Sequence, residues 1–145
     1  MKINIKKLYS DAIIPTRGSS EAAGYDLYAY MGSATKIKSH ETIMIGTGIS
    51  MEIPDGYFGA IYARSGLASK KNLRPANCVG VIDSDYRGEI KIPLFNDSNV
   101  IQIIDKNERV AQIVIMPYLS VEFNEVDELS ETKRNQSGFG STGSK

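Results

Sequence analysis

The stretch from residue 77 to residue 90 carries the densest group of side chains that could do chemistry. Two carboxylates, Asp83 and Asp85, and the aromatic Tyr86 follow the apolar run Val79-Gly80-Val81-Ile82. A carboxylate at the edge of a dry strand can orient a water molecule and take its proton, an effect typically worth ~10²–10⁴ in rate. The simpler alternative is that Asp83 only nucleates a turn and Tyr86 packs in the core, rather than lying against a sugar.

A second group lies in the segment Ala63-Arg64-Ser65-Gly66-Leu67-Ala68. The pattern predicts a strand followed by a short helix through Lys71, with Ser65 as its cap and Asn72 as its end. A guanidinium beside free backbone N–H groups suits a phosphate. An ordinary capped helix next to a surface arginine remains the alternative.

The carboxyl-terminal segment holds a third group. Arg134 precedes Phe139 by five residues, and glycine, serine and threonine surround that aromatic ring. Such a segment could form a phosphate nest with an aromatic that stacks on a base. From about residue 124 the composition is too polar to order itself, so a mobile tail is the alternative.

Several other chemistries are disfavoured by composition. The only histidine, His40, and the only cysteine, Cys78, make a histidine triad, a histidine-rich metal centre or a disulfide improbable, and the Walker pattern is missing. Lys+Arg and Asp+Glu balance at 17 each, which gives no field for holding nucleic acid. No apolar run approaches the ~18 residues of a membrane span, so we expect a cytoplasmic protein without a membrane partner.

Short alternating segments position these groups. Apolar residues alternate with polar ones within residues 3–5, 43–53, 57–63, 90–94, 101–103, 110–116 and 121–123. This spacing predicts an all-β sandwich or barrel over residues 1–123, followed by an arm over residues 124–145. We expect the runs at 79–82 and 90–94 to pair as a β-hairpin whose tip carries Asp83.

Five segments together resemble a known family. They are Ala22-Ala23-Gly24-Tyr25-Asp26-Leu27, the segment 63–68, the segment 80–88, Arg109-Val110-Ala111-Gln112-Ile113, and the segment from Arg134 to Gly143. In this order they are similar to the five motifs of the homotrimeric dUTP diphosphatases. The resemblance implies a distorted jelly-roll β-barrel with one short helix, and a trimer whose swapped arms close over sites built by neighbouring subunits.

The resemblance also implies residue roles. Asp83 would be the general base for a water that attacks the α-phosphorus of dUTP, and Gln112 would hold that water or an α-phosphate oxygen. The phosphate contacts would be Arg64, Ser65, Gly66, Gln112, Arg134, Gly140, Ser141 and Thr142. The uracil and deoxyribose contacts would be Asn77, Gly80, Val81, Ile82, Asp83, Tyr86 and Phe139, with Lys91 as an additional substrate contact. Asp26 would touch the hydration shell of Mg²⁺, the expected cofactor.

Two other functions stay open at this point. A relative of the dCTP deaminases would share the fold, but Gly66 stands where that branch tends to carry a second serine. A non-catalytic module that senses nucleotides is the other alternative, and the presence of Asp83, Gln112 and Arg134 favours chemistry instead. The function that the resemblance implies is hydrolysis of dUTP to dUMP and pyrophosphate, which would limit uracil in DNA and supply dUMP for dTTP synthesis.

Overall fold

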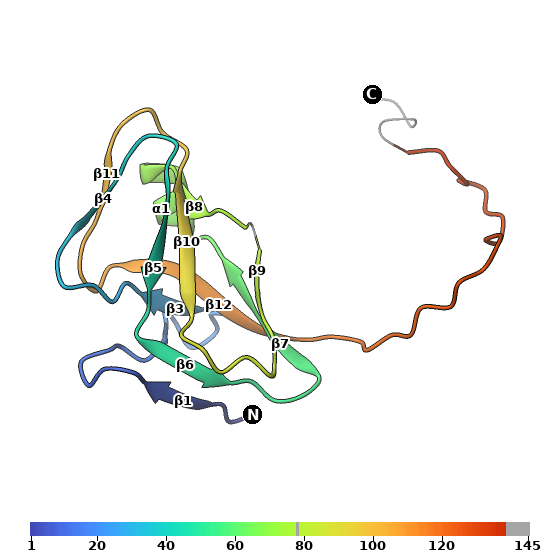
Figure 1. The fold of residues 1–145 in the computed structure, drawn as a ribbon, viewed down its shortest axis with the longest axis horizontal. Coiled ribbons are helices and arrows are strands. Elements are labelled where there is room, and N and C mark those ends of the chain that lie inside the picture. The colour runs from blue at the N-terminus through green and yellow to red at the C-terminus, as the bar shows by residue number, and fades with distance from the viewer. Residues whose placement is uncertain (78, 139–145) are drawn as a thin grey trace.

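The structure is a computed structural model that describes residues 1–77 and 79–138. Its body is built from small antiparallel sheets wrapped around one apolar core, with a single short helix on the described part of the chain. The carboxyl-terminal segment leaves this body as an extended chain (Figure 1). The predicted all-β class is therefore confirmed.

The strands fall into four antiparallel sheets within the described residues. The largest has the order β2 (Thr16–Arg17), β3 (Tyr25–Tyr28), β12 (Arg109–Pro117), β7 (Tyr57–Tyr62) and β9 (Gly80–Ile82). A second has the order β5 (Thr42–Gly46), β10 (Lys91–Asn96) and β8 (Leu73–Pro75). The remaining pairs are β1 (Asn4–Lys7) with β6 (Ile49–Glu52), and β4 (Thr35–Ile37) with β11 (Gln102–Ile104).

Alternation along β10 shows how the sequence pattern builds the core. Ile92 and Leu94 are fully buried, whereas Lys91 between Ile90 and Ile92 is exposed, as its position in the alternation predicts. The buried Asn96 at the end of this strand donates its side-chain amide to the carbonyls of Ile37, Lys38 and Val100. A polar side chain thus ties the second sheet to neighbouring loops without leaving a buried group unpaired.

The helix α1 (Ser65–Lys71) begins one residue earlier than the cap prediction required. Arg64 occupies the cap position with extended backbone angles, and Ser65 is already the first helical residue, so the prediction of Ser65 as the cap is wrong. The strand preceding the helix carries its extended conformation through Arg64, which leaves Ser65 inside the first turn. Asn72 ends the helix in the left-handed conformation (φ 52°), as predicted.

The predicted hairpin between residues 79–82 and 90–94 is wrong. β9 pairs with β7, with Gly80 opposite Ile61 and Ile82 opposite Gly59, whereas β10 pairs with β5 and β8. Residues 83–90 therefore connect two different sheets, and Tyr86 lies in that connection rather than on a return strand. Alternation identifies a strand, but it does not identify the strand's partner.

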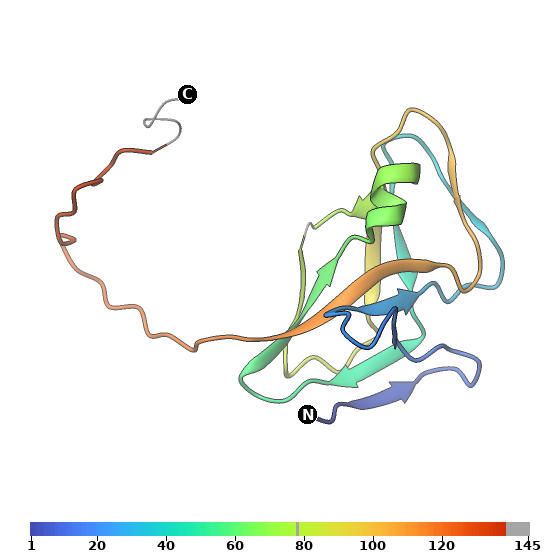
Figure 2. The ribbon, with the colours of Figure 1, turned by 180° about the vertical axis from the view of Figure 1, so that it is seen from behind.

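The chain beyond β12 has no secondary structure up to residue 130, so the strand expected at Val121 and Phe123 does not form within one subunit. Leu119 is 89% exposed and Phe123 is 93% exposed. Figures 1 and 2 show this orange-to-red segment running away from the body in both views. Exposed apolar side chains of this kind are typical of a segment that contacts another surface.

One further property concerns the helix. Within the described residues, no helix combines the length and apolar character that crossing a membrane requires.

Candidate active site

Asp83 follows the last residue of β9 and lies in a turn in which its carbonyl accepts the backbone N–H of Tyr86 at 3.2 Å. Asp83 is exposed and borders a hollow whose walls mix acidic and apolar side chains. The lining residues are Asp55, Phe58, Val81, Asp83, Ser84, Asp85 and Tyr118. A carboxylate in this position can reach a water molecule without first breaking a buried ion pair.

Tyr86 is held over the connection that carries it. Its hydroxyl donates to the carbonyl of Glu89 at 3.0 Å, and its ring covers Gly88, where a methyl group would overlap the phenol. The side chain nevertheless stays 44% exposed. The arrangement leaves part of the side chain open to solvent while the hydroxyl is anchored.

β9 is the last strand of the five-stranded sheet, with β7 as its partner in the part of the chain described. An edge strand presents unpaired N–H and C=O groups, which can pair with an extended peptide or with the edge of a base. Asn77 lies beside this edge, because its Nδ2 would be 3.0 Å from a Cβ built on Gly80. β9 and the residues on either side of it thus carry the predicted uracil and sugar contacts of this region: Asn77, Gly80, Val81, Ile82, Asp83 and Tyr86.

A second cluster centres on Asp26 of β3, which is 8% exposed. The Nε of Arg64 donates to its Oδ1 at 2.6 Å, and Nη1 of Arg109 donates to its Oδ2 at 3.2 Å. Two guanidinium groups around one carboxylate leave an excess positive charge at a half-buried position. That charge suits an anion such as a phosphate group.

A β-bulge places Arg109 in this cluster. Arg109 and Gln112 are three residues apart, so a regular strand would send their side chains to opposite faces. The register of β12 against β3 shifts between Arg109 and Ala111, so that Arg109 lies opposite Tyr28 and Gln112 lies opposite Asp26. The extra residue therefore puts both side chains on the face that carries Asp26.

Gln112 lies next to the backbone of two other segments. Its Nε2 donates to the carbonyl of Ala63 at 3.0 Å, and its Oε1 lies where a methyl group on Gly24 would overlap it. Ser65 and Gly66 are exposed at the start of α1 beside Arg64. Asp26, Arg64, Ser65, Gly66 and Gln112 thus form one polar surface at the junction of β3, β7 and β12.

The two clusters lie at opposite ends of β7. Asp83 follows Ile82, which pairs with Gly59 near the start of that strand, whereas Arg64 follows its end. Six residues of extended chain separate these levels, which corresponds to roughly 20 Å. Asp83 and the anion-binding surface of the same chain are therefore separated by the length of β7.

Other predicted residues lie elsewhere. Lys91 is exposed on β10 with its Nζ 3.5 Å from Oε2 of Glu89. Arg134 bonds within its own segment, where its Nε donates to the carbonyl of Ser137 at 2.8 Å. Phe139, Gly140, Ser141 and Thr142 lie outside the described residues.

Three contributors were missed by the sequence reasoning. Arg109 stands inside a quoted motif, but its contact with Asp26 depends on the bulge. Gly24 makes room for Gln112, and Glu89 accepts the Tyr86 hydroxyl bond through its carbonyl. A glycine beside an aspartate-bearing strand was the available signal for Gly24; none pointed to Glu89.

The donor set fits a hydrated divalent ion better than a protein-only metal cage. Within the described residues there is no cluster of three His, Cys, Asp or Glu side chains able to hold a metal. A carboxylate offers about four lone-pair positions, and the two guanidinium bonds leave Asp26 able to accept from a metal-bound water. Mg²⁺ commonly binds in this way, keeping several waters while phosphate oxygens supply its other ligands.

Comparisons with known proteins identify the family. The dUTPase family model matches residues 10–143. A deoxyuridine 5'-triphosphate nucleotidohydrolase of Hydrogenobaculum sp. is 48% identical over 145 residues, covering 100% of both chains.

Solved structures give the same result. The Staphylococcus bacteriophage 80alpha dUTPase with dUPNHPP is 29% identical, covers 98% of both chains and has a TM-score of 0.87. A mutant dUTPase of phage phi11 of S. aureus, described with a structural Mg(II) ion, shares the fold at a TM-score of 0.79 and 24% identity, covering 90% of this chain and 100% of its own. The jelly-roll-like fold is confirmed, and this chain belongs to the dUTPase family.

Proposed function

We propose that this protein hydrolyses dUTP to dUMP and pyrophosphate. The observation that carries the proposal is the position of Asp83, an exposed carboxylate at the end of an edge strand and beside Tyr86, in a chain of the dUTPase family. A relative that matches the whole chain is named for the same reaction. In the cell this activity would limit uracil in DNA and supply dUMP for dTTP synthesis, with the cytoplasm as its compartment.

Asp83 would act as the general base. Its carboxylate takes a proton from a water molecule, the water oxygen forms a bond to the α-phosphorus, and the bond from that phosphorus to the α,β-bridging oxygen breaks. The electron pair leaves with pyrophosphate, and the proton passes from Asp83 to solvent. General base catalysis of this kind contributes ~10²–10⁴ in rate.

The edge of β9 would recognise the uracil ring of the substrate. Backbone groups of Gly80, Val81 and Ile82, together with the Asn77 amide, would pair with uracil. Cytosine presents the opposite donor and acceptor pattern and would leave buried groups unpaired, which can discriminate by ~10⁴–10⁵. Tyr86 under the deoxyribose would leave no space for a 2′-hydroxyl group.

The Asp26 cluster would bind the phosphate chain. Arg64, Ser65, Gly66 and Gln112 supply donors from the body, while Arg134, Gly140, Ser141 and Thr142 would supply donors from the arm, and Phe139 would stack on uracil. Mg²⁺ bound with the substrate would neutralise the phosphate oxygens and improve pyrophosphate as a leaving group. Asp26 would contact that ion through water.

A homotrimer with shared sites would unite the two clusters. Since Asp83 and Arg64 of one chain lie at opposite ends of β7, a complete site would take its base-reading edge from one subunit and its phosphate surface from another. The arm over residues 124–145 would then reach a site built by neighbours. The exposed apolar residues just before the arm, here called its stem, support this arrangement; they are Leu119, Val121 and Phe123.

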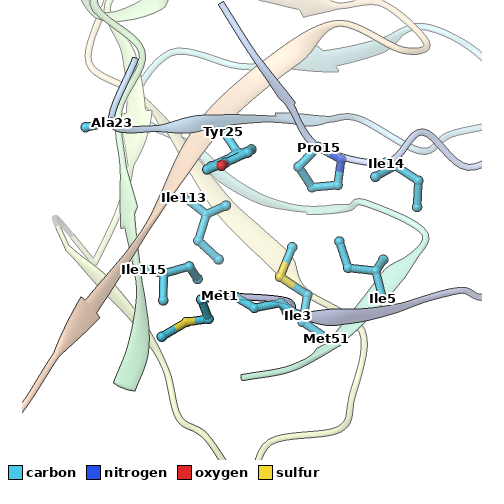
Figure 3. A pocket seen from close by; sticks show the side chains of 10 residues that line it. All are labelled: Met1, Ile3, Ile5, Ile14, Pro15, Ala23, Tyr25, Met51, Ile113 and Ile115. Carbon is cyan, nitrogen blue, oxygen red and sulfur yellow. The ribbon is translucent and has the colours of Figure 1, made fainter. Parts of the chain in front are cut away.

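The body offers a surface for that stem. An apolar cavity of about 460 Å³ lies beside β1, where Ile3, Ile5, Met51 and other apolar side chains point into one space (Figure 3). β1 pairs with β6 alone among the described strands, so its other edge is open. Leu119, Val121 and Phe123 of a neighbour would add a strand there and bury one apolar face.

The substrate proposal is tested by product analysis with dUTP, dCTP, dTTP and UTP, each with and without Mg²⁺. We expect dUMP and pyrophosphate from dUTP in the presence of Mg²⁺, with the other nucleotides turned over at least a hundredfold more slowly. Comparable turnover of dTTP or UTP would contradict the uracil and sugar contacts. Release of ammonia from dCTP would identify a deaminase instead.

A further inference from the structure

Several hydrogen bonds join residues within the connection between β9 and β10. The guanidinium of Arg87 donates through Nη1 to the carbonyls of Ser84 at 2.6 Å and Tyr86 at 3.1 Å. The Tyr86 hydroxyl donates to the carbonyl of Glu89 at 3.0 Å. The orientation of the Tyr86 ring therefore depends on where the Glu89 carbonyl lies.

The Glu89 side chain is anchored to a different part of the body. Its Oε1 accepts the backbone N–H of Gly48 at 2.9 Å, and a Cβ built on Gly46 would lie 2.6 Å from the same oxygen. The side chain is 20% exposed, and its Oε2 lies 3.5 Å from Nζ of Lys91. Gly48 has a φ of 67°, so this carboxylate satisfies the N–H of a buried turn that needs a glycine.

Ile90, the residue after Glu89, makes hydrogen bonds that hold the other side of the same peptide group. The carbonyl of Ile90 accepts from the backbone N of Thr47 at 3.2 Å and from its Oγ1 at 2.6 Å. The N–H of Ile90 donates to the carbonyl of Ile49 at 2.9 Å. The peptide group that presents the Glu89 carbonyl to Tyr86 is thus fixed at one end by Ile90 and at the other by the Glu89 carboxylate.

We propose that Glu89 is a positioning residue for Tyr86 and thereby sets the preference for dUTP over UTP. This role rests on the proposed function, because it assigns Tyr86 to the sugar. Glu89 does not touch the reacting atoms: its carboxylate holds the turn at Gly48, its carbonyl holds the phenol, and the phenol ring closes the space beside the 2′-carbon. Without the bond to Gly48 the carbonyl shifts, the ring gains freedom and a 2′-hydroxyl is excluded less well.

The test compares Glu89→Ala with Glu89→Gln, which keeps an acceptor oxygen for Gly48. We measure kcat/KM for dUTP and for UTP by pyrophosphate release. Glu89→Ala should lower the dUTP/UTP ratio by about tenfold, the expected size of one lost hydrogen bond, while Glu89→Gln stays near wild type. Should Glu89→Ala fail to fold, Glu89→Asp, which is one methylene too short to reach Gly48, takes its place.

A double-mutant cycle separates positioning from general loosening. Tyr86→Phe removes the phenol donor, so it should lower the same ratio, and adding Glu89→Ala should lower it little further. Glu41→Ala is the matched control, since Oε2 of Glu41 likewise accepts a backbone N–H, that of Lys38 at 2.8 Å, on the loop between β4 and β5. That control should leave the ratio unchanged.

The Tyr86 ring signals in NMR spectra of the same variants give a reading that needs no turnover. Glu89→Ala should shift them, whereas Glu89→Gln and Glu41→Ala should not. An unchanged dUTP/UTP ratio with both rates lowered equally, or unshifted Tyr86 signals, would overturn the proposal. A wild type that turns over no dUTP would instead refute the proposed function, while the ring signals would still decide the role of Glu89.

Discussion

At the scale of single residues, the anion-binding surface depends on a glycine that leaves space as well as on the polar side chains that line it. Gln112 fills the space that a side chain at Gly24 would occupy and donates to the carbonyl of Ala63. Asp26 meanwhile holds two guanidinium groups that would otherwise repel each other. Each of these arrangements can be disturbed by one substitution.

Gly24→Ala should displace the Gln112 amide without removing it. The added methyl overlaps Oε1 of Gln112, so the amide must leave the Ala63 carbonyl. We expect kcat for dUTP to fall by about tenfold, as for a misplaced polar contact. Gly32→Ala is the control, because a Cβ there meets nothing within 4 Å. Equal rates for the two variants would show that Gln112 needs no fixed position.

Asp26→Ala should affect both binding and stability. It leaves Arg64 and Arg109 facing each other without their shared carboxylate, and we expect a loss of about 1–3 kcal/mol in the free energy of unfolding. The KM for dUTP should rise, because Arg64 is no longer oriented. Urea denaturation and steady-state kinetics measure the two effects. Asp97→Ala, which breaks the more exposed ion pair with Arg74, should cost less than about 1 kcal/mol.

At the scale of elements, the sequence predicts strands better than it predicts their partners. Alternation located the strand that carries Ile92 and Leu94, and the left-handed Asn72 followed from its residue type. The pairing of β9 with β7 did not follow, because the residues between β9 and β10 form a turn that resembles a hairpin tip but crosses to another sheet. The contact of Arg109 with Asp26 was likewise hidden, since a bulge changes which face a side chain takes.

The arm provides a prediction at this scale. Residues 134–138 bond within their own segment, so deletion of residues 134–145 removes no described contact with the body. Turnover of dUTP should fall by at least a hundredfold, because groups that donate hydrogen bonds to the phosphates are lost. The melting temperature should change by less than about 2 °C. Activity assays and thermal melts check this pair of results. A large fall in melting temperature would assign the deleted residues to the fold instead.

At the scale of the whole molecule, the separation of the two clusters is the finding that sequence motifs could not supply. All five motifs are visible in one chain, but their order in the sequence does not show how far apart their residues lie in the fold. Only the register of β9 against β7 shows that Asp83 and Arg64 lie at opposite ends of a strand. That geometry supports the proposal of a site shared between subunits.

Mixing two inactive variants tests the shared site. The Asp83→Asn subunit retains an intact phosphate-binding surface, and the Arg64→Ala subunit retains the Asp83 carboxylate. Co-refolded at equal amounts, they should form some sites with an intact Asp83 from one subunit and an intact Arg64 from its neighbour. Random assembly gives about a quarter of wild-type activity. Each variant refolded alone is the control, and a mixture no more active than either would place both residues of a site in one subunit.

The role of Asp83 as general base is tested most directly by the rate of pyrophosphate release from dUTP by the wild type and by Asp83→Asn, at saturating dUTP and Mg²⁺. The substituted amide keeps the shape of the side chain but cannot take a proton from water, so kcat should fall by ~10²–10⁴. Binding of a non-hydrolysable dUTP analogue and the melting temperature should stay near those of the wild type, since Asp83 is exposed. An Asp83→Asn protein that still converts dUTP to dUMP at the wild-type rate would contradict the account.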